Sequence, residues 1–331
     1  MTSAATGSLL KELDLEKKQF LGLVELATYL KQERASGAER QRLAGRTIAL
    51  LFEKNSTRIR CAFEVAAAEQ GARTTFIGPE GSHLGREESV RDTARVLGRL
   101  YDGIAFRGSS QASVEQLAAH AHVPVWNALT DLWHPTQMLA DVLTMSEHHD
   151  GSVEDVAFCY TGDGRNNVAR SLLVTGALLG MDVRIAAPPY LQPPDGVVAV
   201  ANYLGAESGA RVTVTADVRA GVRGVDFVYT DVWLSMGESE GDWARRVEEL
   251  LPYRVTSSLM VATGKPSKFM HCLPATHNRE TALGRRLFNR FGLDGVEVTE
   301  QVFESEASIA FDQAENRMHT IKAVLVAALT G

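Results

Sequence analysis

Three arginines stand at or just after the ends of apolar runs in the early part of this 331-residue chain. Arg58 and Arg60 lie in the stretch FEKNSTRIR, which begins at the end of one apolar run, and Arg107 ends another. Guanidinium groups match phosphate oxygens in pairs, which an ammonium group cannot do. Ser56 can cap the helical stretch that follows it, and a helix start attracts anions. The turn therefore predicts a phosphate site, although a capped surface helix with solvated arginines fits this stretch about as well.

Two further polar residues follow a later apolar run. His134 and Gln137 stand at the start of a helical stretch. Their side chains can donate hydrogen bonds to a carbonyl oxygen on which negative charge develops. For His134, the sequence leaves open a structural role as a helix cap beside Pro135. Together with the arginines, these residues suit a phosphorylated carbonyl compound.

The second half of the chain carries groups suited to an amino acid. Asp231 and Asn167 can bind its ammonium and carboxylate, and the loop at Ser235–Gly237, followed by an acidic run, can close over it. Cys272 follows another apolar run, where it is either a nucleophile or a group that orients a substrate. No His–Cys pair can be inferred from sequence, so His271 is expected to be structural.

Apolar runs that alternate with helical stretches must position these groups. Strands are predicted at 47–52, 74–77, 103–107, 123–127, 155–160, 182–186, 211–215, 227–230 and 268–271. Helices are predicted at 9–34, 61–70, 89–100, 113–120, 135–147 and 168–179. This alternation predicts an α/β fold with doubly wound parallel sheets. Ligands of such sheets bind beyond the carboxyl ends of the strands, so we expect the polar residues to face one cleft.

The chain is long enough for two domains, each with its own core. A polar break at 148–152 interrupts the alternating pattern, so we place the first domain at 1–149 and the second at 150–315. The last helix, predicted over 316–329, is strongly apolar and must dock. We expect residues 316–331 to pack back on the first domain.

Composition indicates an ordinary globular protein with a small-molecule partner. Hydrophobic residues make up 45% and charged residues 23% of the chain, and the formal net charge is −7. No basic run is long enough for a nucleic-acid-binding face, and no apolar stretch is long enough for a membrane span. The three cysteines are widely spaced, and Met1–Lys18 lacks a signal-peptide core. We therefore expect a cytoplasmic protein without a disulfide framework.

Four ordered motifs resemble those of the ornithine carbamoyltransferases. They are FEKNSTRIR (52–60), HPTQ (134–137), DVWLSMG (231–237) and HCLP (271–274). The likeness covers essentially the whole chain, down to FDQAENRM at 311–318. The Ser-Met-Gly loop separates the ornithine-using enzymes from their aspartate-using relatives.

The resemblance implies transfer of the carbamoyl group of carbamoyl phosphate to the δ-amine of L-ornithine. The products are L-citrulline and phosphate, in a step of arginine metabolism. The attacking amine must be neutral although a free alkylamine titrates near roughly 10.4, and a desolvated cleft with arginines nearby lowers that pKa. We expect direct attack through a tetrahedral intermediate, with Cys272 as an orienting group that forms no covalent bond.

The resemblance also assigns roles to residues. Those implied to bind carbamoyl phosphate are Ser56, Thr57, Arg58, Ile59, His83, Arg107, His134 and Gln137. Those implied to bind ornithine are Asn167, Asp231, Ser235, Met236, Cys272 and Leu273. Those implied to be catalytic are Arg58, Arg107, His134, Cys272 and Arg317. The family further implies a homotrimer, or a multiple of trimers, in which a neighbour's loop around His83 completes each site, with no metal or organic cofactor.

Three positions depart from the family pattern, all on the donor side. Ile59 stands where relatives usually have Thr, His83 replaces a usual Gln, and Glu87 replaces a common Lys. A lost hydroxyl contact to phosphate at Ile59 would cost about 1–3 kcal/mol, whereas a contact through the backbone amide would lose little. We hypothesise that carbamoyl phosphate binds more weakly here than in a typical relative, or that the donor is modified.

Other functions fit parts of the sequence. The run TGDGRNN at 161–167 contains a Gly-x-Gly after a strand, but Asn167 takes the place of the third glycine of a dinucleotide-binding fingerprint. A catalytically silent ligand-binding paralogue is a second alternative, and transfer to another amine is a third. An NADH titration, a citrulline assay and a comparison of ornithine, lysine and putrescine as acceptors would separate them.

Overall fold

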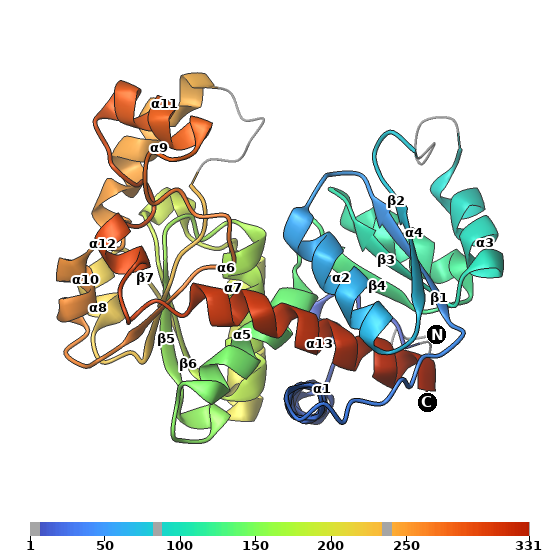
Figure 1. Ribbon diagram of the computed structural model, residues 1–331. Coiled ribbons are helices and arrows are strands. Elements are labelled where there is room, and N and C mark those ends of the chain that lie inside the picture. Colours follow the sequence, from blue (N-terminus) through green and yellow to red (C-terminus); the bar gives the residue numbers. More distant parts are fainter. Residues whose placement is uncertain (1–6, 82–87, 234–239, 331) are drawn as a thin grey trace. The chain divides into compact units, whose positions relative to one another are not determined.

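The computed structural model describes residues 7–81, 88–233 and 240–330 (Figure 1). By its internal contacts the chain divides into two compact units. The first unit comprises Met1–Leu143 with Glu315–Gly331, and the second comprises Thr144–Ala314. Each unit is built on its own sheet of parallel strands, so the predicted doubly wound α/β class is confirmed.

The first unit contains a four-stranded sheet with the order β2-β1-β3-β4. Its strands are β1 (Thr47–Phe52), β2 (Arg73–Ile77), β3 (Gly103–Arg107) and β4 (Val125–Leu129). The helices of this part of the chain are α1 (Lys17–Ala35), α2 (Thr57–Glu69), α3 (Val90–Leu100), α4 (Gln111–Ala121) and α5 (Pro135–Glu147). α3 and α4 pack on one face of the sheet and α2 lies on the other (Figure 1). Covered on both faces, β1 and β3 read as continuous apolar runs rather than alternating ones.

The N-terminal segment differs from the helix predicted over 9–34. Leu9 is extended beside β4, where its backbone exchanges hydrogen bonds of 3.0 and 2.8 Å with Val125 and Asn127. A 3-10 turn follows at Glu12–Asp14, and α1 begins only at Lys17. Pairing with the sheet edge therefore overrides the helical periodicity of these first residues.

The second unit contains a five-stranded sheet with the order β7-β6-β5-β8-β9. Its strands are β5 (Ala157–Thr161), β6 (Asp182–Ala186), β7 (Arg211–Thr215), β8 (Phe227–Tyr229) and β9 (Lys268–Met270). Its helices are α6 (Asn167–Leu179), α7 (Asp195–Ser208), α8 (Val218–Val222), α9 (Glu240–Leu250), α10 (Ser257–Ala262), α11 (Ala282–Phe291) and α12 (Glu300–Phe303). α6 and α7 cover one face of the sheet, and α8 and α10 cover the other (Figure 1).

The last helix, α13, runs from Ala310 to Thr330 and so begins earlier than the predicted residue 316. From Glu315 onward it belongs to the first unit, where the Nζ of Lys322 lies 2.5 Å from an oxygen of Glu69. The prediction that this helix packs with the first domain is therefore confirmed. Neither α13 nor any other described helix is both long enough and apolar enough to cross a lipid bilayer.

Both sheets reverse their strand order next to the first strand of the unit. β1 lies between β2 and β3, and β5 lies between β6 and β8. Ligands of open α/β sheets bind outside the carboxyl ends of the strands at such a reversal. Arg107 ends β3 and Asp231 follows β8, so the fold places predicted site residues at both reversals.

Candidate active site

The carboxyl ends of β1 and β3 bring together the predicted phosphate-binding residues of the first unit. Ser56 caps α2, and its hydroxyl accepts a hydrogen bond of 3.4 Å from the amide of Ile59. Thr57 and Arg58 open the helix, in the turn whose N–H groups have no partner within the helix. Arg107 stands at the end of the neighbouring strand, where the positive charge of Arg58 lowers its pKa. The cluster thus combines a helix start with two guanidinium groups.

Arg107 has an environment that is unfavourable for a cation. Its Nε and Nη1 atoms are buried, and no described residue offers them a hydrogen bond. Burial lowers the pKa of Arg107, the charges of Arg317 and Arg58 lower it further, and Asp131 opposes the shift. Buried N–H donors that gather near other cations are suited to a multivalent anion, which supplies both acceptors and counter-charge.

His134 is buried and neutral. Its side chain is 1% exposed, and its Nε2 lies 2.8 Å from Nη2 of Arg317. Because a guanidinium only donates, Nε2 must accept, which leaves the ring proton on Nδ1. Desolvation, with the charges of Arg317 and Arg107, holds the pKa of His134 well below its usual value. His134 is therefore a hydrogen-bonding group rather than a cationic acid at neutral pH.

Gln137, in the first turn of α5, belongs to the same cluster. Its Oε1 accepts a hydrogen bond from Nη2 of Arg317, and its Nε2 donates to Oδ1 of Asp141 at 2.6 Å. Sequence analysis did not identify Asp141. The spacing of four residues from Gln137 on one helix face is the signal that could have found it. The structure thus gathers five predicted residues in the first unit: Arg58, Arg107, His134, Gln137 and Arg317.

Arg60 does not join the other arginines. Its Nε donates to Glu64 at 2.8 Å, and its guanidinium carbon lies 3.9 Å from the centroid of the Phe76 ring. A separation of two residues turns Arg60 onto a different side of α2 from Arg58. The side chain of Ile59 is 3% exposed and so belongs to the core. Grouping Arg60 with the anion-binding arginines from sequence was therefore wrong.

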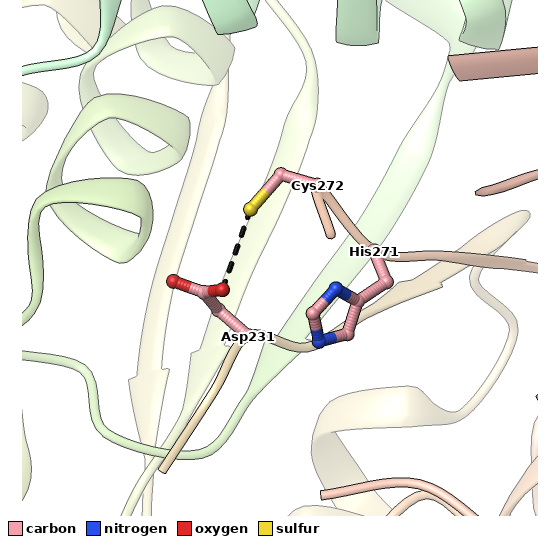
Figure 2. A group of neighbouring side chains, drawn as sticks. All are labelled: Asp231, His271 and Cys272. Atoms are coloured by element: carbon pink, nitrogen blue, oxygen red, sulfur yellow. Dashed lines mark hydrogen bonds between the residues drawn. The ribbon is translucent and has the colours of Figure 1, made fainter. Parts of the chain in front are cut away.

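The second unit brings Asp231, Asn167 and Cys272 to the carboxyl ends of neighbouring strands. The Sγ of Cys272 donates to Oδ1 of Asp231 at 3.3 Å (Figure 2). Nδ2 of Asn166 lies 3.5 Å from the other carboxylate oxygen, and Asn167 begins α6 directly after this cap. Cys272 therefore touches Asp231 and is intermediate in exposure.

Asp231 is a buried carboxylate that favours a cationic ligand. Burial raises its pKa, while His271, the amide of Val232 and the thiol of Cys272 act in the opposite direction. A positively charged group placed beside this carboxylate would relieve the cost of its desolvation. The chemistry of this position therefore suits an ammonium group.

His271 and Glu297 hold the loop that carries Cys272. Nδ1 of His271 accepts from the amide of Leu273 at 2.9 Å, and its Nε2 lies 3.6 Å from Oε1 of Glu297. The same oxygen of Glu297 accepts from the amide of Thr276. Leu273 has a φ of 58°, a left-handed conformation that a branched side chain adopts only where its surroundings enforce it. These contacts agree with the structural role expected of His271.

Glu297 was missed by sequence analysis, although one acidic residue inside the apolar run GVEV is a visible signal. We expect Glu297→Ala to lower the free energy of unfolding by about 2–4 kcal/mol, since the buried amide of Thr276 loses its acceptor. Glu297→Gln keeps an acceptor and should retain most of that stability. Urea denaturation of both variants measures the difference, and equal losses would show that Thr276 is not the reason.

Among the described residues, two groups of three side chains place possible metal-ligand atoms close together. One consists of Asp231, His271 and Cys272 (Figure 2), and the other of His277, Glu300 and Glu304, with the ligand atoms of each group within 4.8 Å of one another. In the first group, Sγ of Cys272, Oδ1 of Asp231 and Nδ1 of His271 already take part in the hydrogen bonds described above. In the second group, Nδ1 of His277 lies 2.6 Å from Glu300. Both groups offer three ligands, one fewer than a closed structural zinc site requires.

Three of the predicted binding residues lie outside the described part of the chain. They are His83, Ser235 and Met236. Glu87, noted as a departure from the family pattern, lies outside it as well. Their predicted roles rest on the sequence alone.

Two family models together match most of the chain. Residues 8–147 match the carbamoyl-P binding domain of aspartate/ornithine carbamoyltransferase. Residues 154–328 match the Asp/Orn binding domain of the same family. The two matches divide the chain near the boundary between the two sheets.

Similar proteins carry related names. The chain is 55% identical over 326 residues to a protein from Chromobacterium violaceum named "Ornithine carbamoyltransferase, catabolic", with 97% of each chain covered. The solved structure of ornithine carbamoyltransferase from Pyrococcus furiosus superimposes with a TM-score of 0.88 at 38% identity, covering 96% of this chain and 95% of that one. The anabolic ornithine carbamoyltransferase from Campylobacter jejuni superimposes with a TM-score of 0.85 at 32% identity, covering 97% and 98%.

Proposed function

This chain belongs to the aspartate/ornithine carbamoyltransferase family, and we propose that its two units divide the two substrates between them. The protein is a transferase that moves the carbamoyl group of carbamoyl phosphate to ornithine. We assign carbamoyl phosphate to the domain 1–149 with 316–331, and ornithine to the domain 150–315. The family matches to residues 8–147 and 154–328 support a boundary near residue 150, and the grouping of Glu315–Gly331 with the first unit supports the assignment of the last helix.

The phosphate group is bound by the start of α2 and by the arginines of the first unit. Ser56, Thr57 and Arg58 supply the helix start and one guanidinium, and Arg107 supplies the second. The observation that carries this assignment is that two buried nitrogen atoms of Arg107, Nε and Nη1, have no hydrogen-bond acceptor among the described residues. A phosphate dianion offers acceptors in a matching geometry and neutralises the local positive charge.

The carbamoyl end is bound by His134, Gln137 and Arg317, together with Arg58. Negative charge develops on the carbamoyl oxygen as the amine attacks, and fixed donors lower the energy of that state. Because His134 is neutral, it contributes a hydrogen bond and no proton to the leaving group. The cationic contribution therefore comes from the arginines.

Ornithine is bound by Asp231 and Asn167, with Ser235 and Met236 as further contacts expected from the family. The raised pKa of Asp231 supports an ammonium ligand, whose charge would favour the ionised carboxylate. Cys272 and Leu273 line the reacting centre. Cys272 orients Asp231 through the hydrogen bond that its thiol donates, and it does not act as a nucleophile.

The reaction is a direct displacement at the carbamoyl carbon. The neutral δ-amine of ornithine forms the new C–N bond, and the tetrahedral intermediate then breaks its C–O bond to phosphate. The amine loses one proton, which the departing phosphate accepts, and the phosphate leaves with the electrons of the broken C–O bond. Positioning of the two substrates and stabilisation of the developing charge supply most of the acceleration.

Citrulline formation from carbamoyl phosphate and ornithine tests this function directly. Ornithine, lysine and putrescine should be compared as acceptors at equal concentration. We expect citrulline from ornithine and little product from the other two amines. Equal turnover with lysine or putrescine would assign a different acceptor, and no turnover with any of them would indicate a silent ligand-binding protein.

Restoring threonine at Ile59 should tighten donor binding and destabilise the fold. The isoleucine side chain is 3% exposed, so Ile59→Thr loses buried apolar surface worth about 1–2 kcal/mol of unfolding free energy. If the new hydroxyl reaches phosphate, KM for carbamoyl phosphate falls by roughly tenfold, which corresponds to about 1.4 kcal/mol. Steady-state kinetics and thermal denaturation measure the two effects, and Ile59→Val is the matched control. An unchanged donor KM would count against the hypothesis of weakened donor binding.

Weak donor binding would suit the direction named for the Chromobacterium violaceum relative. An enzyme that runs from citrulline and phosphate must release carbamoyl phosphate as a product, and a looser site releases it faster. We propose that this protein favours that direction kinetically. Its rates in the two directions, measured with wild type and Ile59→Thr, test the proposal.

We propose that the protein is a homotrimer, or a multiple of trimers, with active sites shared between subunits. We also propose that it is located in the cytoplasm. Family membership and the resemblance of the sequence around His83 support the assembly, and the three free cysteines support a reducing compartment. Light scattering coupled to size-exclusion chromatography tests the assembly. A monomer that forms citrulline at full rate would contradict it.

A further inference from the structure

Asp141 is a buried carboxylate next to the carbamoyl-binding residues, with no substrate contact assigned to it. It lies one helical turn beyond Gln137 on α5, and both side chains are 1% exposed. Its Oδ1 accepts the hydrogen bond from Nε2 of Gln137 at 2.6 Å. A buried carboxylate is costly unless it has hydrogen bonds and counter-charge, so its place here requires a reason.

The contacts of Gln137 depend on which way its amide group faces. A carboxylate only accepts hydrogen bonds, so Asp141 holds the nitrogen end of the amide, and the oxygen end then faces Arg317. A reversed amide would set NH₂ against the guanidinium, two donors facing each other, and an oxygen against the carboxylate, two acceptors facing each other. Asp141 therefore favours one of the two orientations strongly.

The chain of contacts continues from Gln137 to the carbamoyl-binding groups. Nη2 of Arg317 donates to Oε1 of Gln137 and lies 2.8 Å from Nε2 of His134. Because Arg317 shares one nitrogen between these two acceptors, the orientation of Gln137 also fixes where Arg317 and His134 meet.

We propose that Asp141 is a positioning residue for carbamoyl transfer, which acts by fixing the amide of Gln137 and through it the contact of Arg317 with His134. This inference rests on the proposed role of Gln137 at the carbamoyl end. Nε2 of Gln137 carries two hydrogens, and one of them is donated in the hydrogen bond to Asp141. Asp141 thus acts on the substrate only through Gln137 and Arg317.

A double-mutant cycle tests the proposal. Kinetic constants are measured for wild type, Asp141→Ala, Gln137→Ala and the double variant. We expect Asp141→Ala to lower kcat by roughly 10–100-fold, because a small displacement of a substrate-positioning group costs about that much. If Asp141 acts through Gln137, the double variant should lie within about threefold of Gln137→Ala alone. Losses that multiply would overturn the proposal.

Two further variants separate positioning from a general loss of stability. Asp141→Asn keeps the shape of the side chain, but its NH₂ group can donate a hydrogen bond to Oε1 of a reversed Gln137 amide. This variant should therefore have a lower kcat, with little change in melting temperature. Leu139→Met, a volume-conserving change at a buried position of α5, lies two residues from both Gln137 and Asp141 and therefore on another side of the helix, so it should leave kcat unchanged. Wild-type kcat for Asp141→Asn would overturn the proposal. Wild-type kcat for Gln137→Ala would refute the proposed role of Gln137 itself. A low kcat for Gln137→Ala, together with a double variant in which the two kcat losses multiply, would refute only the role of Asp141.

Discussion

Replacing Arg107 by methionine should lower kcat/KM for carbamoyl phosphate by about 4 kcal/mol, roughly a thousandfold. Arg107 has two buried nitrogen atoms, Nε and Nη1, for which no described residue is an acceptor, and the proposed phosphate is their partner. Truncating one member of a buried charge pair leaves the other without its counter-charge, which is why the loss is large. The inhibition constant of inorganic phosphate should weaken with it, since phosphate binds the same guanidinium.

The same variant should be more stable than wild type in phosphate-free buffer. Burial and the charges of Arg317 and Arg58 lower the pKa of Arg107, so the charged guanidinium destabilises the fold unless an anion is bound. Phosphate at 100 times its Kd stabilises a protein by about 2.7 kcal/mol, and the variant should lose most of that gain. Thermal denaturation with and without phosphate measures both effects.

Arg60→Met is the matched control for Arg107→Met. Arg60 is exposed, donates to Glu64 and stacks over Phe76, so its removal should change kcat/KM by no more than about 1 kcal/mol. Equal losses in the two variants would mean that phosphate is held by general positive charge. A destabilised Arg107→Met protein that keeps its affinity for phosphate would contradict the assignment of Arg107.

That the candidate residues lie at the ends of strands could be predicted from the sequence, because the ends of buried strands are visible in it. Apolar runs such as Thr47–Phe52 and Gly103–Arg107 are buried on both faces, so their ends are marked by the first polar residue. The topology of a parallel sheet then brings those ends to one edge. Only the end of each strand had to be read correctly for Arg58, Arg107 and Asp231 to be found.

Residues that support the site were not predicted, because they act through partners far apart in the chain. Glu297 bonds to Thr276 and faces His271, and no local pattern connects these positions. Arg60 shows the opposite error, since its residue type suggested an anion contact that its side of α2 does not allow. Side-chain direction around a helix and contacts between distant segments are what periodicity leaves undetermined.

Several helices of the second unit were also absent from the prediction. α8 and α12 are so short that packing rather than propensity determines them. α7 follows the proline-rich segment 188–194, whose prolines hide the start of a regular helix. The N-terminal segment failed for a related reason, since Leu9 pairs with the edge of the sheet at Trp126. In each case a tertiary contact outweighs the local sequence.

Each unit contains a buried charged group, and the two groups have opposite sign. Burial lowers the pKa of Arg107 in the first unit, whereas burial raises the pKa of Asp231 in the second. Each shift means that the charged form costs free energy in the protein and is favoured by a ligand of opposite charge. A phosphorylated donor and an amino-acid acceptor are a pair of ligands with these two signs. Substrate binding should therefore stabilise each unit by offsetting the free-energy cost of its buried charged group.

Replacing Asp231 by asparagine should lower kcat/KM for ornithine by about 3 kcal/mol, more than a hundredfold, while the inhibition constant of phosphate stays unchanged. The carboxylate is the proposed partner of an ornithine ammonium group, and asparagine keeps its shape without its charge. The loss should therefore appear on the acceptor side alone. A weakened phosphate affinity of similar size would show that the substitution disturbs more than ornithine binding.

The stability of Asp231→Asn carries a defined dependence on pH. The folded pKa of Asp231 is raised, so its contribution to stability is fully present below the unfolded pKa of about 3.9 and is lost as pH rises through the folded pKa. At pH 7 the ionised carboxylate thus costs stability, and the asparagine variant should unfold at a higher temperature than wild type. The difference should shrink as pH falls toward about 4. Asp182→Asn is the control of opposite sign, because Asp182 bonds to Arg184 at 2.7 Å and its loss should destabilise the protein without affecting ornithine. If Asp231→Asn is less stable than wild type at pH 7, the carboxylate is compensated by its own neighbours, and an ammonium ligand is not needed to explain it.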